Sequence, residues 1–179
     1  MNDADPGVRS RAARALRGAR SGIAGLCRRL EIEQVTSVRT ALLTSLIRLK
    51  SPDVVERLAE FLRSENVALR SAVIEALQVM PDVALPTLER LLGDADSDVR
   101  IFAVDVLNEL RHPEVPALLV RVLLQDDNVN VCLAALDGLA DLDDDVLFDP
   151  LRAFVKRFPA VPNVQFVAKS LIRRIRGSA

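Results

Sequence analysis

A repeat of about thirty residues is the feature that most constrains how this chain folds. A Val or Leu followed by Arg, with a Leu seven residues after that Arg, occurs at Val8-Arg9, Val38-Arg39, Leu69-Arg70 and Val99-Arg100. Weaker copies follow at Val131-Cys132 and Val164-Gln165. The second members of these pairs lie 30, 31, 30, 32 and 33 residues apart. A near-constant period of this length is typical of stacked structural repeats.

Each repeat has room for two helices, and its apolar residues follow helical spacing. In residues 52–63 one stripe holds Val54, Val55, Leu58, Phe61 and Leu62, and residues 68–79 contain a similar stripe. No segment alternates apolar and polar residues as a strand would. The sequence therefore predicts an all-α fold, a right-handed α-solenoid of about six helix-pair repeats, of which the first is half a repeat.

The repeats are predicted to form a single domain over residues 1–179, divided roughly at 1–20, 21–50, 51–80, 81–111, 112–142 and 143–176. After a lone helix at 6–20, the predicted pairs are 21–31 with 36–49, 52–63 with 66–79, 83–93 with 97–110, 113–125 with 128–141, and 144–158 with 162–176. Second helices are expected to begin at the capping residues Asp5, Asn66, Asp96 and Asn128. Three prolines are expected in the connections, namely Pro81, Pro159 and Pro162.

Composition fits a folded chain whose core consists of many similar aliphatic layers. Half of the residues are hydrophobic, yet there are six Phe and no Trp or Tyr. No stretch approaches 18 uncharged apolar residues, and the charged N-terminal segment does not resemble a secretory signal. We therefore expect a cytoplasmic protein with no membrane span. Cys27 and Cys132 form no metal-binding or disulfide pattern, so no cofactor is expected.

The segment from Asp94 to Leu107 has the pattern DxDxDVRxxAxxxL. It resembles the short HEAT-like repeats first associated with phycobilisome lyases, and the resemblance extends over nearly the whole chain. The resemblance implies that recurrent Asp and Arg residues form ladders between repeats, a role that would fall to Arg39, Arg70, Arg100, Asp94 and Asp98. Cys132 and Gln165 replace the Arg, which puts the ladder in doubt at the C-terminal end.

Polar residues on the second helices are expected to line the inner, concave face of the array, where a partner would bind. They lie at the sixth, ninth and tenth positions after the Val or Leu of each repeat. The predicted partner-binding set is Glu75, Gln78, Asp105, Asn108, Glu109, Asp137 and Asp141. Glu75, Asp105 and Asp137 would form a carboxylate row that receives a basic helix or peptide. A solvated face that only keeps the array soluble is an equally simple explanation.

HEAT-like arrays serve several functions, so the fold resemblance leaves the function open. We expect a scaffold or adaptor that binds another protein. One alternative is a subunit of a bilin-lyase-like modifying complex, either non-catalytic or of lyase type. The other is nucleic-acid binding through the basic N-terminal arginines, although no Tyr or Trp is present for base stacking. These N-terminal arginines are Arg9, Arg11, Arg14, Arg17, Arg20, Arg28 and Arg29.

Residues that could support catalysis are few. His112 is the one histidine and precedes Pro113 in a turn between repeats. Cys132 lies between apolar Val131 and Leu133, which favours a buried structural thiol over a nucleophile. The acidic run 141–145 lacks the Gly and the terminal Glu of a calcium loop. The sequence therefore predicts a protein that is not an enzyme in its own right.

Overall fold

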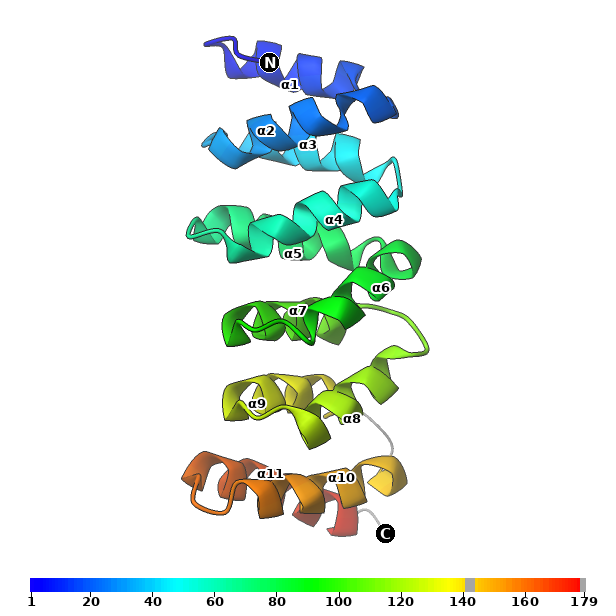
Figure 1. The fold of residues 1–179 in the computed structure, drawn as a ribbon, viewed down its shortest axis with the longest axis vertical. Helices are drawn as coiled ribbons and strands as arrows, with labels where there is room; N and C mark the ends of the chain where they lie inside the picture. Colours follow the sequence, from blue (N-terminus) through cyan, green and yellow to red (C-terminus); the bar gives the residue numbers. More distant parts are fainter. Residues whose placement is uncertain (141–143, 178–179) are drawn as a thin grey trace. The chain divides into compact units, whose positions relative to one another are not determined.

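The computed structural model describes residues 1–140 and 144–177, and within them the regular structure is entirely helical (Figure 1). The α-helices are α1 Pro6–Ala15, α2 Ile23–Ile32, α3 Thr36–Ile47, α4 Pro52–Glu60, α5 Val67–Gln78, α6 Pro81–Leu91, α7 Ser97–Glu109, α8 Val115–Gln125, α9 Val129–Gly138, α10 Asp144–Arg157 and α11 Pro162–Gly177. Single 3₁₀ turns precede α2 at Arg20–Gly22 and follow α4 at Phe61–Arg63. The predicted all-α solenoid is confirmed.

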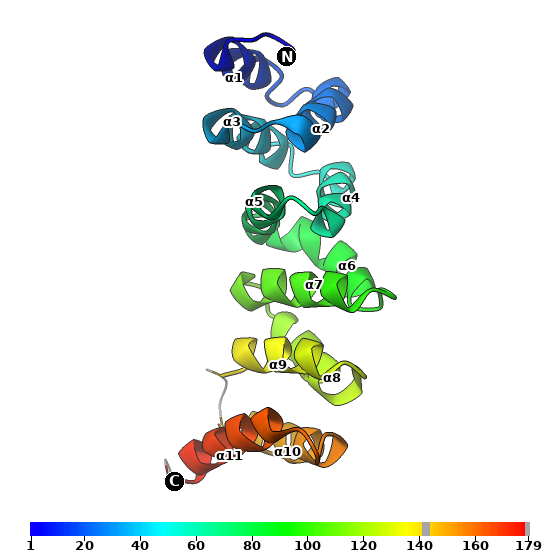
Figure 2. The same cartoon turned by 90° about the vertical axis from the view of Figure 1, so that its left-hand side faces the viewer.

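The helices gather into two compact units, Met1–Leu88 and Glu89–Ala179, here called the N-terminal unit and the C-terminal unit. In the N-terminal unit α3 packs against both α1 and α5, and α2 packs against α4 (Figure 2). In the C-terminal unit α7 lies beside α9, and α8 lies beside α10. Each unit thus has one layer of second helices and one layer of first helices, as stacked helix pairs require.

The core of each unit is built from the aliphatic residues that recur with the repeat. The Leu seven residues after each ladder Arg is fully buried at Leu46, Leu77 and Leu107, and Leu139 occupies the same place after Cys132. Leu16, at the equivalent position of the half repeat, is only half-buried. Burial of one such side chain contributes about 2 kcal/mol. The recurrent Leu therefore contributes to the stability of each layer.

The four predicted caps form as expected. The side chains of Asp5, Asn66, Asp96 and Asn128 each accept a backbone N–H in the first turn of α1, α5, α7 and α9. The expectation for two prolines was wrong, because Pro81 and Pro162 are the first residues of α6 and α11 rather than parts of the connections. A first helical residue has no N–H partner in its own helix, so proline is tolerated there.

Candidate functional site

The acidic residues predicted to meet a partner come together in the C-terminal unit, on the layer of second helices. Asp105 and Glu109 lie on α7, and Asp137 lies on the neighbouring α9. Glu109 and Asp137 are exposed, and Asp105 is half-buried. Burial and, to a smaller extent, the negative charge of Asp137 raise the pKa of the Asp105 carboxyl. The two carboxylates are therefore close enough to repel each other. We call Asp105, Glu109 and Asp137 the acidic face.

Asn108 was predicted for the same surface, but its side chain lies between α7 and α9. Its Nδ2 donates to the backbone oxygen of Ala134 at 3.1 Å. The side chain fits there because Gly138 has no Cβ; a methyl group at Gly138 would lie 2.1 Å from the Asn108 Oδ1 atom. Asn108 thus links adjacent second helices.

The remaining predicted partner-binding residues are not part of the acidic face. Glu75 and Gln78 lie on α5 in the N-terminal unit. Glu75 is exposed and Gln78 is half-buried. Asp141 lies outside the described residues. Of the three carboxylates in the predicted row, Asp105 and Asp137 lie on adjacent helices, whereas Glu75 belongs to the N-terminal unit.

One backbone contact, which the sequence pattern did not predict, is shared by the arginines of the first four repeats. These are Arg9 and the predicted ladder residues Arg39, Arg70 and Arg100, and from here on all four are called ladder arginines. Each donates a hydrogen bond to the carbonyl oxygen of the residue six positions earlier, in the loop before its own helix. The contacts are Arg9 to Asp3 at 2.9 Å, Arg39 to Glu33 at 2.9 Å, Arg70 to Ser64 at 2.6 Å and Arg100 to Asp94 at 2.8 Å. Cys132 keeps the same contact through its thiol, 3.2 Å from the Asp126 oxygen. Equivalent sequence positions therefore occupy equivalent environments.

The residue six positions before each ladder position has a second recurring role through its side chain. Its oxygen accepts the backbone N–H two residues further along, which tightens the loop into a turn. This bond forms at Asp3, Glu33, Ser64, Asp94 and Asp126, with distances of 2.8, 3.0, 3.2, 3.0 and 2.8 Å. Four of the five are acidic, and this signal was present in the sequence. Asp98, predicted for the ladder, lies exposed in the first turn of α7.

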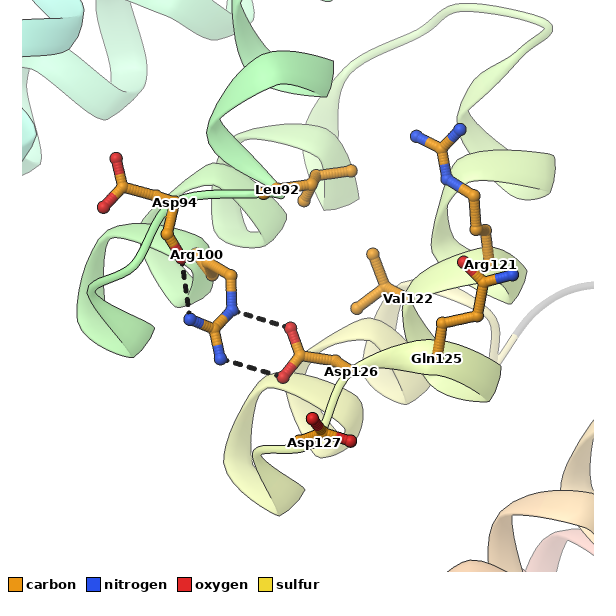
Figure 3. Close-up of a pocket in the computed structure, with 9 residues that line it drawn as sticks. Leu92, Asp94, Arg100, Arg121, Val122, Gln125, Asp126 and Asp127 are labelled. Carbon is orange, nitrogen blue, oxygen red and sulfur yellow. Dashed lines mark hydrogen bonds and ion pairs between the residues drawn. The ribbon is translucent and has the colours of Figure 1, made fainter.

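Two of these carboxylates also bind the arginine of the preceding repeat. Arg100 Nε and Nη2 donate to the two Asp126 oxygens at 2.7 and 3.0 Å, as Figure 3 shows. Asp94, Asp126 and Arg100 line an open pocket that also includes Arg121 and Asp127. Arg9 binds Glu33 in the same two-point manner at 2.9 and 3.0 Å. The hydrogen bonds to Asp126, and to a smaller extent the negative charge of that residue, raise the pKa of Arg100, so the guanidinium remains charged.

A family model for HEAT repeats matches residues 1–78, 23–100 and 84–161. The chain belongs to the HEAT-repeat family. The expectation drawn from the DxDxDVR segment is thereby confirmed at the level of the family. No curated protein matches the sequence of this HEAT-repeat chain.

Two solved structures resemble this HEAT-repeat protein. One is an engineered protein, with 17% identity, a TM-score of 0.46 and coverage of 98% of this chain and 93% of the other. The second is the complex of CpcE and CpcF of phycocyanin lyase from Nostoc sp. PCC7120, with 23% identity and a TM-score of 0.37. That match covers 94% of this chain and 74% of the other. Both likenesses are too weak to bear on function.

At Cys132 the repeat has no arginine of its own, and the guanidinium of an arginine on another helix binds the loop there instead. Arg157, on α10, donates to the backbone oxygens of Asp126 and Leu123 and to the Cys132 sulfur. Gln165 donates to the Val155 and Phe158 oxygens at 3.3 and 3.4 Å. The loop before α9 is therefore still held by an arginine, but one from a first helix.

Several arginines that could have bound nucleic acid are engaged within the N-terminal unit. Arg29 binds Glu33 at 2.7 Å, beside the Arg9 contact, and the Glu33 side chain is 1% exposed. Burial alone would raise the pKa of Glu33, but hydrogen bonds from Arg9, the Val35 N–H and Arg29 lower it to about 2. The exposed basic residues that remain in this region are Arg11, Arg14, Arg17, Arg20 and Arg28.

Both thiols of the HEAT-repeat chain are buried and held in the protonated form. Burial raises the pKa of Cys27 to about 11, against a smaller opposite effect of Arg57. Burial likewise raises the pKa of Cys132, which outweighs the nearby Arg157. A thiolate is the reactive species, so these positions fit structural thiols. His112 lies in the turn before α8, where its Nδ1 accepts the Glu114 N–H at 3.3 Å.

Residues 1–140 and 144–177 contain no group of three or more His, Cys, Asp or Glu side chains placed to hold a metal ion. None of the described helices is long and apolar enough to span a bilayer.

Proposed function

We propose that this chain is a protein-interaction scaffold, and that the acidic face of its C-terminal unit binds a basic segment of a partner protein. HEAT repeats suggest such a role, because stacked helix pairs present long surfaces built from equivalent positions. The proposal is carried by one observation, the half-buried Asp105 beside Asp137.

Two like charges on adjacent helices are unfavourable for the fold alone. An Arg or Lys from a partner, placed between Asp105 and Asp137, would relieve their repulsion and gain charge-assisted hydrogen bonds. Glu109, on the same helix as Asp105, extends the negative surface towards the end of α7. A basic helix or peptide is therefore the partner that fits this surface best.

The two alternatives have less support. Of the N-terminal arginines that could bind nucleic acid, Arg9 and Arg29 are already bound to Glu33. A subunit role in a bilin-lyase-like complex rests on the sequence resemblance, and no contact within residues 1–140 and 144–177 points to it. The raised pKa values of both thiols support a non-catalytic role.

The proposal is tested by affinity capture with mass spectrometry, comparing the wild type with an Asp105→Lys, Asp137→Lys variant. The matched control is Glu114→Lys, Asp149→Lys, which makes the same charge change at exposed positions outside the second helices. Partners captured by the wild type and the control should be lost from the first variant. They should also elute as the salt concentration rises. Equal capture by all three proteins would refute the acidic face as the binding site.

A further inference from the structure

Arg39 differs from Arg9 and Arg100 in the contacts of its guanidinium. Arg9 and Arg100 each place Nε and Nη2 against a carboxylate of the next repeat. Arg39 is 6% exposed, and its buried Nε has no hydrogen-bond partner. Its Nη2 donates to the Glu33 backbone oxygen at 2.9 Å. A buried guanidinium with an unsatisfied donor is costly, so this site calls for an explanation.

The difference arises from one residue. The position that supplies Glu33 to Arg9 and Asp126 to Arg100 is occupied by Ser64 in the repeat that follows Arg39. The Ser64 hydroxyl still accepts the Asn66 N–H at 3.2 Å, so the turn is preserved. A hydroxyl carries no charge, however, and the carboxylate that completes the other two sites is missing here.

The guanidinium of Arg39 is also oriented differently. In Arg9 and Arg100 the loop carbonyl is bound by Nη1, which leaves the edge formed by Nε and Nη2 for the carboxylate. In Arg39 the carbonyl is bound by Nη2. If the Arg39 guanidinium rotated so that Nη1 bound the Glu33 carbonyl, the edge formed by Nε and Nη2 would face an incoming carboxylate. This is the orientation seen at Arg9 and Arg100.

An open groove of about 510 Å³ adjoins this site, between α3 and α5. At the Arg39 end its walls are small or uncharged, and its far end is apolar except for Thr44 and Glu75. It is lined in full by Thr36, Arg39, Thr40, Leu43, Thr44, Ile47, Ala68, Ser71, Ala72, Glu75, Ala76 and Val79. Glu75 lies seven residues beyond Ala68 along α5, or about 10 Å at the rise of an α-helix. The groove therefore has a cationic end and an anionic end.

We propose that Arg39 is a binding site for the carboxylate of an acidic side chain on a partner protein, whose adjoining residues lie along the groove between α3 and α5. The acid supplies from outside the contact that Glu33 and Asp126 supply from within at Arg9 and Arg100. A partner segment fits better than a free metabolite, because the groove is open, extends along both helices and is lined mostly by uncharged side chains. The site lies in the N-terminal unit and does not depend on the acidic face.

The test uses acetate as the minimal carboxylate probe and observes the arginine Nε–H groups by ¹H–¹⁵N NMR, with chloride replaced at constant ionic strength. An Arg39→Lys variant, which has no Nε, assigns the signal. In the wild type the Arg39 signal should shift saturably, while the Arg9 and Arg100 signals, already bound to carboxylates, should not. The absence of a saturable shift at Arg39, or an equal shift at all three arginines, would overturn the proposal.

Two substitutions at Ser64 provide the matched control. Ser64→Asp places at this position the residue type found at Asp3, Asp94 and Asp126, so the turn should form as it does there. It should satisfy Arg39 from within and abolish the response to acetate. Ser64→Asn has nearly the same shape without the charge and should retain that response. If Ser64→Asp responds as the wild type does, the site is not the one proposed.

Succinate distinguishes a protein side chain from a small metabolite. A site for a single side-chain carboxylate should prefer succinate over acetate only by the statistical factor that arises because succinate has two carboxylates. Binding of succinate roughly tenfold tighter than acetate, or more, would indicate a second built contact for a small molecule. That outcome would overturn the assignment to a partner protein.

Discussion

The Arg9 guanidinium and the Glu33 carboxylate meet at two points inside the N-terminal unit, 2.9 Å from Nε to Oε2 and 3.0 Å from Nη2 to Oε1. The same carboxylate accepts hydrogen bonds from Arg29 and from the Val35 N–H. One buried side chain therefore joins the half repeat of α1 to the loop before α3. Glu33 is therefore expected to contribute to the packing of the first helix.

Glu33→Gln should destabilise the protein by about 2 kcal/mol or more, since it removes the charge from a carboxylate that accepts several charge-assisted hydrogen bonds. Gln is close to Glu in shape, so the loss reports the charge rather than a cavity. The measurement is urea unfolding of wild type and variant at pH 7. Glu31→Gln, an exposed neighbour on α2, is the control and should change the free energy of unfolding by less than about 0.5 kcal/mol.

The Glu33 contribution should disappear in acid. Its pKa lies at about 2 in the folded protein, below the ordinary value of 4.5, so the unfolded chain takes up the proton first. The stabilisation is therefore complete above about pH 4.5 and is lost as the pH falls towards 2. The difference in unfolding free energy between wild type and Glu33→Gln, followed from pH 7 downwards, should narrow over that interval. A difference independent of pH would contradict the assigned contact.

Contacts that recur with the repeat could be predicted from the sequence. The period located the helices and the recurring arginines, because equivalent positions meet equivalent neighbours in a stack. In the first five repeats the residue six positions before the repeat position is acidic in every case but one. The exception is Ser64, which lies where a carboxylate would otherwise meet Arg39. These features depend on local spacing, which the sequence displays directly.

Contacts that break the period could not be predicted in this way. Arg157 reaches the Asp126 carbonyl from a first helix, at a position with no counterpart in the other repeats. Asn108 occupies a position of the polar face, yet it is half-buried because Gly138 leaves space for it on α9. Such pairs depend on the distance between two helices, which no residue pattern along one helix records.

Gly138→Ala should destabilise the C-terminal unit by about 1 to 3 kcal/mol, since the new methyl group would overlap the Asn108 side chain. A Cβ at this position would also lie 2.8 Å from Leu119 Cδ1. Adding Asn108→Ala to Gly138→Ala should therefore recover only part of the loss in a double-mutant cycle.

Gly25→Ala is the control for that substitution. Gly25 lies inside α2 with open space around its Cβ position, so alanine should be neutral or stabilise by up to about 1 kcal/mol. Thermal unfolding of each variant measures both effects. Equal responses at Gly25 and Gly138 would mean that Asn108 does not occupy the space next to α9.

Cys27 and Cys132 should react slowly with a thiol reagent at pH 8 in the folded protein. Burial raises the pKa of Cys27 to about 11 and also raises that of Cys132, which leaves little thiolate at either position. In denaturant both thiols should react at the rate of a model peptide. Rapid labelling of either one under native conditions would show that its helix opens readily or that the thiol is ionised.

Asp105→Asn should stabilise the protein at pH 7 by about 0.5 to 1 kcal/mol. The pKa of Asp105 is raised in the folded state, first by burial and then by Asp137, so its ionised form is disfavoured by folding. Stability is therefore lost as the pH rises from the ordinary value of 3.8, and the advantage of the Asn variant should vanish in acid below that value. Urea unfolding at both pH values tests the sign.

If the acidic face binds a basic partner, the same substitution should weaken capture of that partner while it strengthens the fold, because the charge that folding disfavours is the one that the partner requires. A gain in stability with undiminished capture would instead identify Asp105 and Asp137 as part of a solvated surface.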